Sequence, residues 1–175
     1  MIAALLHPAV NVRAPRYLVA RAGCACCHCA GKIVAIGIAL DAGHRIRVEP
    51  GTRRVGGVRE DAWHTVRSPA WLFAIEYLPR RVSVRLRMLS AGYRRVESPT
   101  FSDRLWLNRC PHCGAVQEDD YLHGEPDVAF MPLTAAAAER IELLAIEAPF
   151  AAVIGGTCDD PPLFGAMLRS DRRSE

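Results

Sequence analysis

The feature that most constrains this chain is a pair of matching cysteine motifs that lie far apart in the sequence. Cys26-Cys27-His28-Cys29 and Cys110-Pro111-His112-Cys113 share their cysteine spacing and their inner histidine, and each leads into a small residue. Two thiolates three positions apart on a tight turn can face one ion, and the small residue lets the backbone approach closely. Two such turns complete a tetrahedral shell of four sulfurs, the usual closed structural zinc site. The sequence therefore predicts Zn²⁺ held by Cys26, Cys29, Cys110 and Cys113.

The distance between the motifs is compatible with one shared site. Residues 30–109 separate them, whereas simple zinc ribbons use about fifteen to twenty residues. The longer loop costs only about 1.5 kcal/mol more in closure entropy, and structural zinc supplies on the order of 10–16 kcal/mol. Zinc fits better than iron or copper because four thiolates leave no open position and need no redox change.

The choice among the clustered cysteines depends on the residue after each pair. Cys24 and Cys27 form an overlapping pair, but Cys27 is followed by His28, whereas Cys29 is followed by Ala30-Gly31. The pair 26/29 is therefore favoured, and Cys24 and Cys27 are either bystanders or a second ligand set for metal exchange. His28 and His112 are predicted to be exposed turn residues. Cys158, alone in the sequence, is predicted to be a small buried hydrophobe.

The expected fold class is α+β, with a zinc-ribbon-like two-knuckle module and a mixed strand and helix insert. The length suits one domain over residues 1–175, with knuckles at 24–32 and 108–116, an insert at 33–107 and a C-terminal segment at 117–175. The predicted elements are strands at 33–38, 46–48, 82–88, 93–96 and 105–107, a helix at 70–78 ended by Pro79, loops at 51–57 and 117–127, and a helix from 135 capped by Thr134. Residues 140–144 either continue that helix or begin a strand.

Charge is distributed unevenly along the chain. Residues 1–109 carry a net charge of +11 and residues 110–175 a net charge of −8. Either the two halves partly neutralise each other, or the basic half presents a surface to an anionic partner. Arg81, just before the strand predicted at 82–88, and Arg85 and Arg87 within it would share one face, which makes nucleic acid a candidate partner. No aromatic residues alternate with them for base stacking, so contact with the acidic half is the favoured interpretation.

The start of the chain does not resemble a membrane segment. The apolar stretch 1–10 is interrupted by His7 and Pro8; it is too short to span a bilayer, and no cationic segment precedes it. We therefore expect a cytoplasmic protein without a membrane partner, in a compartment where clustered cysteines bind metal more often than they form disulfides.

The second motif and its surroundings carry a resemblance. Asn108, Cys110-Pro111-His112-Cys113-Gly114-Ala115 and Gln117 match an Asn-x-Cys-Pro-x-Cys-Gly-Ala-x-Gln segment. In this the chain resembles uncharacterised bacterial proteins that also have a Cys-x-x-Cys knuckle near the start. The resemblance covers both knuckles and a few flanking residues, and Glu118 stands where those proteins often have glycine. It implies zinc binding and no particular activity.

An enzyme is the rival class, because a dense group of polar residues follows the second motif. This group comprises Glu118, Asp119, Asp120, His123 and Glu125. His123-Gly124-Glu125 is similar to the H-x-E of zinc deaminases, but there the motif precedes the paired cysteines and supplies a metal ligand. The Asp-His dyad of HNH-type nucleases is absent between the knuckles, and the β-α-β pattern of thioredoxin-like proteins is missing. The favoured interpretation is a non-catalytic binding domain supported by structural zinc.

Overall fold

The computed structural model describes residues 7–47 and 63–171. The loop predicted at 51–57 lies outside this range. The elements are β1 Val12–Ala14, β2 Tyr17–Ala25, β3 Lys32–Leu40, β4 Arg45–Arg47, β5 Trp63–Thr65, β6 Ala70–Tyr77, α1 Arg80–Leu89, β7 Tyr93–Glu97, β8 Arg104–Arg109, β9 Val116–Gln117, α2 Asp119–Gly124, α3 Ala135–Ala138, β10 Glu142–Ile146, β11 Phe150–Asp159, the 3₁₀ turn η1 Phe164–Ala166 and β12 Leu168–Asp171.

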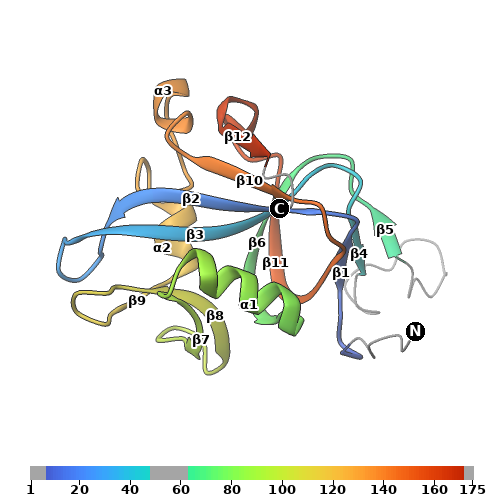
Figure 1. Cartoon of the computed structure of the whole chain (residues 1–175), viewed down its shortest axis with the longest axis horizontal. Helices are drawn as coiled ribbons and strands as arrows, with labels where there is room; N and C mark the ends of the chain where they lie inside the picture. Colours follow the sequence, from blue (N-terminus) through green and yellow to red (C-terminus); the bar gives the residue numbers. More distant parts are fainter. Residues whose placement is uncertain (1–6, 48–62, 172–175) are drawn as a thin grey trace.

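Most of these strands join one large, curled sheet (Figure 1). Within the described residues it has nine strands in the order β12-β10-β2-β3-β6-β11-β1-β4-β5. Of the strands that the structure describes, only β10 and β12 pair in parallel. A separate three-stranded antiparallel sheet, β7-β8-β9, lies beside the long β2–β3 hairpin (Figure 1).

The β2–β3 hairpin is buried on both faces. Along β2, Tyr17 and Val19 belong to one apolar cluster, whereas Leu18 and Ala20 belong to another. Successive side chains of a strand point to opposite faces, so each face of the hairpin meets its own core. On β3, Gly37 faces the ring of Phe130, and a Cβ there would lie 3.1 Å from it. The small residues on this face therefore make room for large rings from the covering layer.

Helices cover the two faces unequally. Helix α1 contributes Val82 and Leu86 to the cluster that includes Tyr17 and Val19. The other cluster is covered by short segments, with Leu122 from α2, Ala138 from α3 and Phe164 from η1. Thr134 caps α3 as predicted, since its side chain accepts a hydrogen bond from the Ala137 N–H. Residues 140–144 lead into β10, so a strand begins there.

The predicted α+β, zinc-ribbon-like fold class is wrong. The described chain is mostly β, and the insert between the knuckles supplies central strands of the large sheet, not an appendage to a ribbon. The loop predicted at 117–127 is also wrong, because this range contains Gln117 of β9 and all of α2. The strands predicted at 33–38, 93–96 and 105–107 are confirmed.

The segment predicted as a helix at 70–78 forms a strand in the structure, and the segment predicted as a strand at 82–88 forms a helix. Residues 70–77 form β6 between β3 and β11, where Trp71 and Leu72 pack into different cores. A strand buried on both faces loses the polar alternation that would identify it. Pro79 precedes the helix, a position where its missing N–H is tolerated. The arginines of α1 do not share one strand face, and Arg81 donates a hydrogen bond to the Pro149 carbonyl at 2.7 Å.

Asn108 joins the small sheet to the large one. Its Nδ2 donates to the Ile36 carbonyl and its Oδ1 accepts from the Ile36 N–H, both at 2.8 Å. Strand β3 pairs with β6 only at Ala39 and Leu40, so the backbone groups of Ile36 on that edge would otherwise lack partners. A buried backbone group without a partner is costly. The amide of Asn108 thus replaces a neighbouring strand at this point.

The Asn108 contact makes a quantitative prediction. Asn108→Leu keeps a similar volume but leaves the Ile36 N–H and carbonyl unpaired and buried, so we expect the free energy of unfolding to fall by about 2–5 kcal/mol. Urea unfolding of the metal-loaded protein measures it. Arg104→Ala, at an exposed position of the same strand, is the control and should change stability by less than about 0.5 kcal/mol. Equal stability of Asn108→Leu and the parent would contradict the bridging role.

Candidate metal centre

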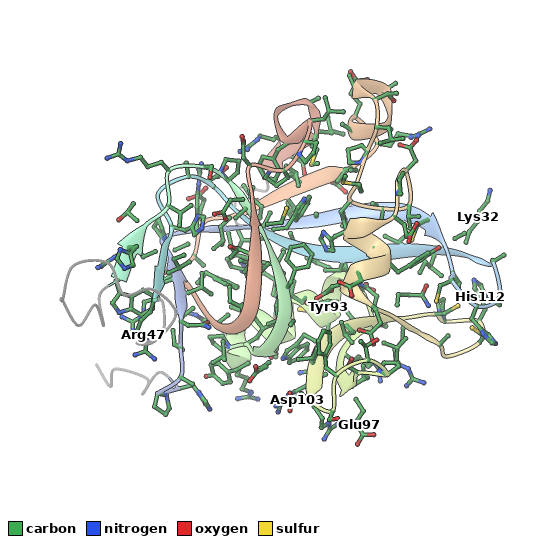
Figure 2. The ribbon with its side chains drawn as sticks, turned by 180° about the vertical axis from the view of Figure 1, so that it is seen from behind. Lys32, Arg47, Tyr93, Glu97, Asp103 and His112 are labelled. Atoms are coloured by element: carbon green, nitrogen blue, oxygen red, sulfur yellow. The ribbon has the colours of Figure 1, made fainter. Side chains whose placement is uncertain are left out.

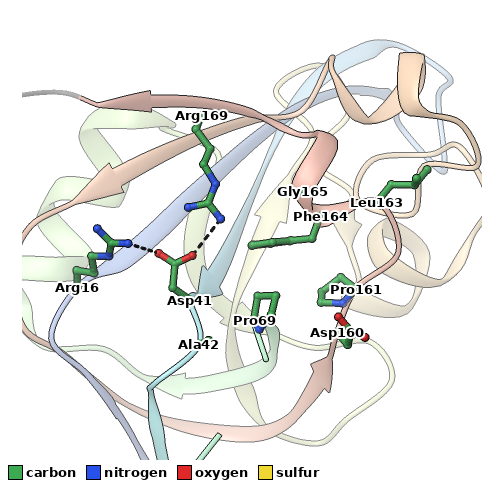
Figure 3. A pocket seen from close by; sticks show the side chains of 10 residues that line it. All are labelled: Arg16, Asp41, Ala42, Pro69, Asp160, Pro161, Leu163, Phe164, Gly165 and Arg169. Carbon is green, nitrogen blue, oxygen red and sulfur yellow. Dashed lines mark hydrogen bonds and ion pairs between the residues drawn. The ribbon is translucent and has the colours of Figure 1, made fainter. Parts of the chain in front are cut away.

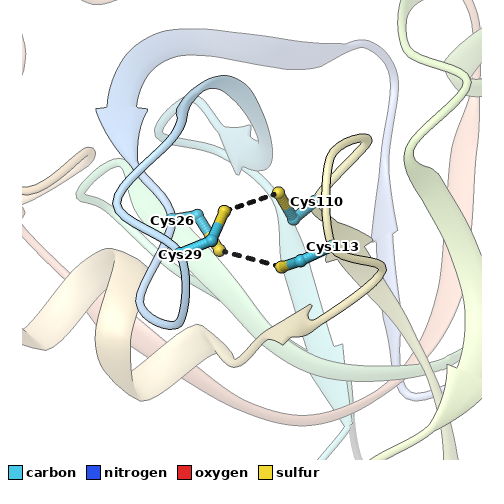
Figure 4. A group of neighbouring side chains, drawn as sticks. All are labelled: Cys26, Cys29, Cys110 and Cys113. Carbon is cyan, nitrogen blue, oxygen red and sulfur yellow. Dashed lines mark hydrogen bonds between the residues drawn. The ribbon is translucent and has the colours of Figure 1, made fainter.

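The four predicted cysteines come together at the tips of two hairpins (Figure 4). Cys26 and Cys29 lie in the turn between β2 and β3, and Cys110 and Cys113 lie in the turn between β8 and β9. All four Sγ atoms lie within 4.8 Å of one another. Of the residues that the structure describes, only these four form such a group. Two turns far apart in sequence therefore present their sulfurs to one point.

The sulfur spacing matches a tetrahedral shell. Cys26 Sγ lies 3.7 Å from Cys113 Sγ, and Cys29 Sγ lies 3.7 Å from Cys110 Sγ. With metal–sulfur bonds of about 2.3 Å, neighbouring sulfurs of a regular tetrahedron are about 3.8 Å apart. Cys26 and Cys110 are buried, whereas Cys29 and Cys113 are exposed. The donor set is compatible with a bound metal ion.

The two turns have the same internal hydrogen bonds. The His28 N–H donates to Cys26 Sγ and the His112 N–H to Cys110 Sγ, each at 3.4 Å. Each turn is closed by two further backbone hydrogen bonds. In the first turn, the Ala30 N–H donates to the Cys26 carbonyl and the Cys26 N–H donates to the Gly31 carbonyl. In the second turn, the Gly114 N–H donates to the Cys110 carbonyl and the Cys110 N–H donates to the Ala115 carbonyl. N–H groups aimed at sulfur favour the thiolate form.

The residue after the second cysteine adopts a left-handed conformation in both turns. Gly114 has φ +77° and Ala30 has φ 56°. Glycine takes this conformation without strain, whereas a residue with a Cβ is strained by about 1–2 kcal/mol. The small residue that the sequence pattern required is thus needed for backbone geometry as well as for space.

Two side chains link the turns, and sequence reasoning missed their roles. Gln117, which is fully buried, accepts from the Cys27 N–H at 2.9 Å and donates to Cys26 Sγ at 3.4 Å. The ring of His112 lies 3.1 Å from the Lys32 carbonyl through Nε2, and this ring crowds Gly31, where a Cβ would lie 2.9 Å from it. Both histidines of the motifs are exposed, as predicted. Gln117 stands four residues after Cys113, and its place in the segment that carries the resemblance was the only signal for it.

The thiols differ in how readily they ionise. Burial by itself raises the pKa of Cys26, but the backbone N–H groups of Cys29 and His28 and the neighbouring thiols outweigh burial and lower it to about 6. Cys113 accepts from the Ala115 backbone, yet burial and the other three thiols raise its pKa to about 11. Four thiols in so small a volume do not all ionise without a cation, so metal binding would release protons.

The remaining cysteines lie outside the group of four. Cys24 is half-buried, and burial together with Cys26 and Cys27 raises its pKa to about 11. Cys27 is exposed, with its Sγ 3.8 Å from the Val116 carbonyl. Cys158 is exposed on β11, so the prediction that it is buried is wrong.

The polar residues after the second motif mainly contact the chain itself. Glu118 accepts hydrogen bonds from Ser98 Oγ and the Thr100 N–H. Asp119 accepts from the N–H of Ala74 at 2.8 Å, where β6 is irregular and Ala74 has φ 47°. Asp120 and Glu125 are exposed. These contacts join α2 to β6 and to the segment after β7.

His123, from the same group, is enclosed by aromatic rings. Its ring centroid lies 5.1 Å from that of Trp71, 4.8 Å from Phe73 and 4.7 Å from Phe130. Burial lowers the pKa of His123 to about 3. This histidine is therefore neutral at physiological pH and part of the apolar layer beneath α2.

A surface pocket of about 540 Å³ lies away from the cysteines (Figure 3). Asp41 lines it and accepts from Arg16 at 2.9 Å and from Arg169 at 3.0 Å. The guanidinium of Arg169 also lies 5.6 Å from the ring of Phe164. Asp41 and the two arginines at the pocket wall are thus already paired with one another, and none of the three belongs to the metal centre.

Comparison of the chain with protein-family models, curated proteins and solved structures found no match. The resemblance to bacterial knuckle proteins therefore stays an expectation from the motifs. Among the described residues, no helix has the length and apolar composition needed to cross a bilayer.

The two turn residues give a matched pair of opposite predictions. Ala30→Gly removes left-handed strain and Gly114→Ala introduces it, so the first should stabilise the metal-loaded protein and the second destabilise it, each by about 1 kcal/mol. Urea unfolding and the rate of metal release to a chelator measure the effect. Gly124→Ala is the control, since its φ is not positive and a Cβ there meets nothing within 4 Å. Changes of the same sign at positions 30 and 114 would rule out the conformational explanation.

Asp119 and His123 predict opposite pH dependences. Burial is the main cause that raises the pKa of Asp119 to about 6, so the parent loses stability as pH rises from about 4 through 6. The pKa of His123 is lowered to about 3, so the parent loses stability as pH falls from about 6.5, where the unfolded histidine gains a proton. Relative to the parent, the free energy of unfolding of Asp119→Asn should therefore increase as pH rises. That of His123→Leu should increase as pH falls.

Urea unfolding of both variants and the parent between pH 4 and pH 7.5 checks this pair. Each pKa unit corresponds to about 1.4 kcal/mol. Taking the difference from the parent at each pH removes the contribution of all other groups, including the cysteines. Parallel curves for parent and variants would show that neither group titrates differently in the folded state.

Proposed function

We propose that this chain is a zinc protein in which Cys26, Cys29, Cys110 and Cys113 hold one structural Zn²⁺. The observation that carries the proposal is the set of four sulfurs within 4.8 Å of one another, all supplied by the chain. When the protein fills all four positions, none is left for a substrate or a reactive water, and the site is structural. Bound zinc would supply a cross-link between the two hairpin tips.

The cross-link would offset the entropic cost of bringing the two turns together. The β8–β9 turn meets the β2–β3 turn across an interval of residues 30–109, and loop closure over that distance costs entropy that the metal–sulfur bonds offset. Near this point the small sheet β7-β8-β9 contacts the β2–β3 hairpin through the side chains of Asn108, Gln117 and His112. The zinc would fix the orientation of that sheet.

We further propose that residues 1–175 act as a single binding domain in the cytoplasm and not as an enzyme. This rests on the closed donor set and on the structural contacts of Glu118, Asp119 and His123. Thiolate ligands also need a reducing compartment to remain free.

Metal content and cysteine variants test the proposal. Protein purified under reducing conditions should contain one zinc per chain, and cobalt substitution should give strong thiolate charge-transfer absorption. Serine at position 26, 29, 110 or 113 should abolish stoichiometric zinc and make the hairpin tips sensitive to protease, because the cross-link is lost. Cys24→Ser, Cys27→Ser and Cys158→Ser are matched controls and should keep the metal.

Two results would contradict the proposal. One is less than about half an equivalent of zinc, or iron in its place, in freshly reduced protein. The other is loss of metal in Cys24→Ser to the same extent as in Cys29→Ser, which would assign the first pair to 24/27. If Cys27→Ser slowed metal exchange while keeping full occupancy, the spare thiols would have a role in metal transfer.

A further inference from the structure

A basic and aromatic surface lies at the end of the large sheet, on strands β1, β4 and β5. Arg13 pairs with Arg45 across β1 and β4, and Arg47 pairs with Trp63 across β4 and β5. These four residues occupy one face of the sheet, because Val12 and Ile46, which alternate with them, pack towards the core on the other. We call the four residues, together with His7 and Tyr77, the Trp63 surface.

Three guanidinium groups surround a single indole. The guanidinium carbon of Arg13 lies 4.5 Å from the ring centroid of Trp63, and those of Arg45 and Arg47 lie 6.0 Å from it. A cation within about 6 Å of an aromatic face is attracted to it. The ring therefore helps to gather like charges that would otherwise repel one another.

Two further rings extend this surface along the sheet. Trp63 and Tyr77 are both partly buried and pack against the same small cluster of Val10, Ala151 and Val153. The ring of His7 stacks on Tyr77, with centroids 4.8 Å apart and planes inclined by 30°. His7 is exposed. Aromatic faces thus occur on both sides of the small cluster, beside the arginines.

Within the described chain, the arginines of this surface differ from several others in having no acidic partner. Arg16, Arg21 and Arg169 each form an ion pair with a carboxylate. No ion pair joins Arg13, Arg45 or Arg47 to an acidic residue of the described chain, and the hydrogen bond that Arg47 donates there goes to the Pro8 carbonyl, at 3.2 Å. Three cations that no described carboxylate pairs with favour an anionic ligand.

We propose that the Trp63 surface binds single-stranded nucleic acid. Arginines can pair with successive phosphates, and the exposed ring of His7 and the partly exposed rings of Trp63 and Tyr77 can stack on unpaired bases. An acidic peptide or a lipid headgroup would satisfy the charges but would leave the rings without a matching partner. A duplex hides its base faces and would use the arginines alone. The combination of cations with aromatic faces is what favours a single strand.

This inference goes beyond the proposed zinc role and does not depend on it. Arg47 lies at the end of the molecule opposite His112 and Lys32, which mark the cysteine turns (Figure 2). It also concerns residues other than Arg81, Arg85 and Arg87, which lie on α1.

The test is a fluorescence anisotropy titration of the full, zinc-loaded chain with a labelled mixed-sequence strand of about 20 nucleotides, as RNA and as DNA. Affinity should fall with salt, with a slope of log affinity against log salt of about −0.7 per phosphate contact, and so up to about −2 for three arginines. Arg45→Ala should weaken binding and reduce the slope by about 0.7. Trp63→Ala should weaken binding about 5- to 150-fold through lost stacking, whereas Trp63→Phe should keep most of the affinity.

Arg87→Ala, which removes the same charge at an exposed position of α1, is the matched control and should bind like the parent. Because Trp63 also packs against neighbours, Arg13→Ala and Arg45→Ala, whose side chains are exposed, keep the test valid if the tryptophan variants fold poorly. The inference is overturned if neither strand binds at low salt, or if Arg87→Ala weakens binding as much as Arg45→Ala. Tighter binding to the duplex of the same sequence, to phosphatidylserine vesicles or to polyglutamate would also overturn it.

Discussion

The tips of the β2–β3 and β8–β9 hairpins are joined by side chains of one hairpin that satisfy backbone groups of the other. Asn108 pairs with both backbone groups of Ile36, Gln117 accepts from the Cys27 N–H, and His112 meets the Lys32 carbonyl. Apolar contact alone would allow the small sheet to slide or rotate, whereas hydrogen bonds fix direction and register. This polar join sets the positions from which the four sulfurs converge. A dication among them would then stabilise an arrangement that hydrogen bonds have already oriented.

The fold was only partly predictable from sequence because its central strands are buried on both faces. The period-two pattern identifies a strand when one of its faces is exposed to solvent, and the strands at 93–96 and 105–107 were predicted correctly. At 70–77 both faces are covered, so the apolar run resembles a buried helix. At 80–89 the alternation of Val82, Val84 and Leu86 resembles a strand, yet only Val82 and Leu86 are buried, which is the spacing of one helix face. Packing against the rest of the chain therefore determines the secondary structure of both segments.

The site was more predictable than the fold, for a local reason. A turn that aims two sulfurs at one point is encoded within about six consecutive residues, so the two motifs identified Cys26, Cys29, Cys110 and Cys113 without knowledge of the insert. The side chains that join the turns are different. The role of Gln117 depends on how β9 lies beside the first turn, and that position follows from packing across the whole insert. The resemblance included Gln117 by position, but gave no indication of what it contacts.

The same burial that obscured the fold also limits where this protein can carry function. The central strands β2, β3 and β6 direct their side chains into apolar layers on both faces, and polar chemistry there would need partners that those layers do not offer. Two places away from these layers are the hairpin tips and the outer end of the sheet. The sulfur cluster occupies the first kind of position and the Trp63 surface the second. Because a well-packed sheet lies between them, a substitution at an exposed arginine of the Trp63 surface should leave the geometry of the sulfur cluster unchanged, whereas Trp63 itself packs against Val10, Ala151 and Val153 and so also stabilises the sheet.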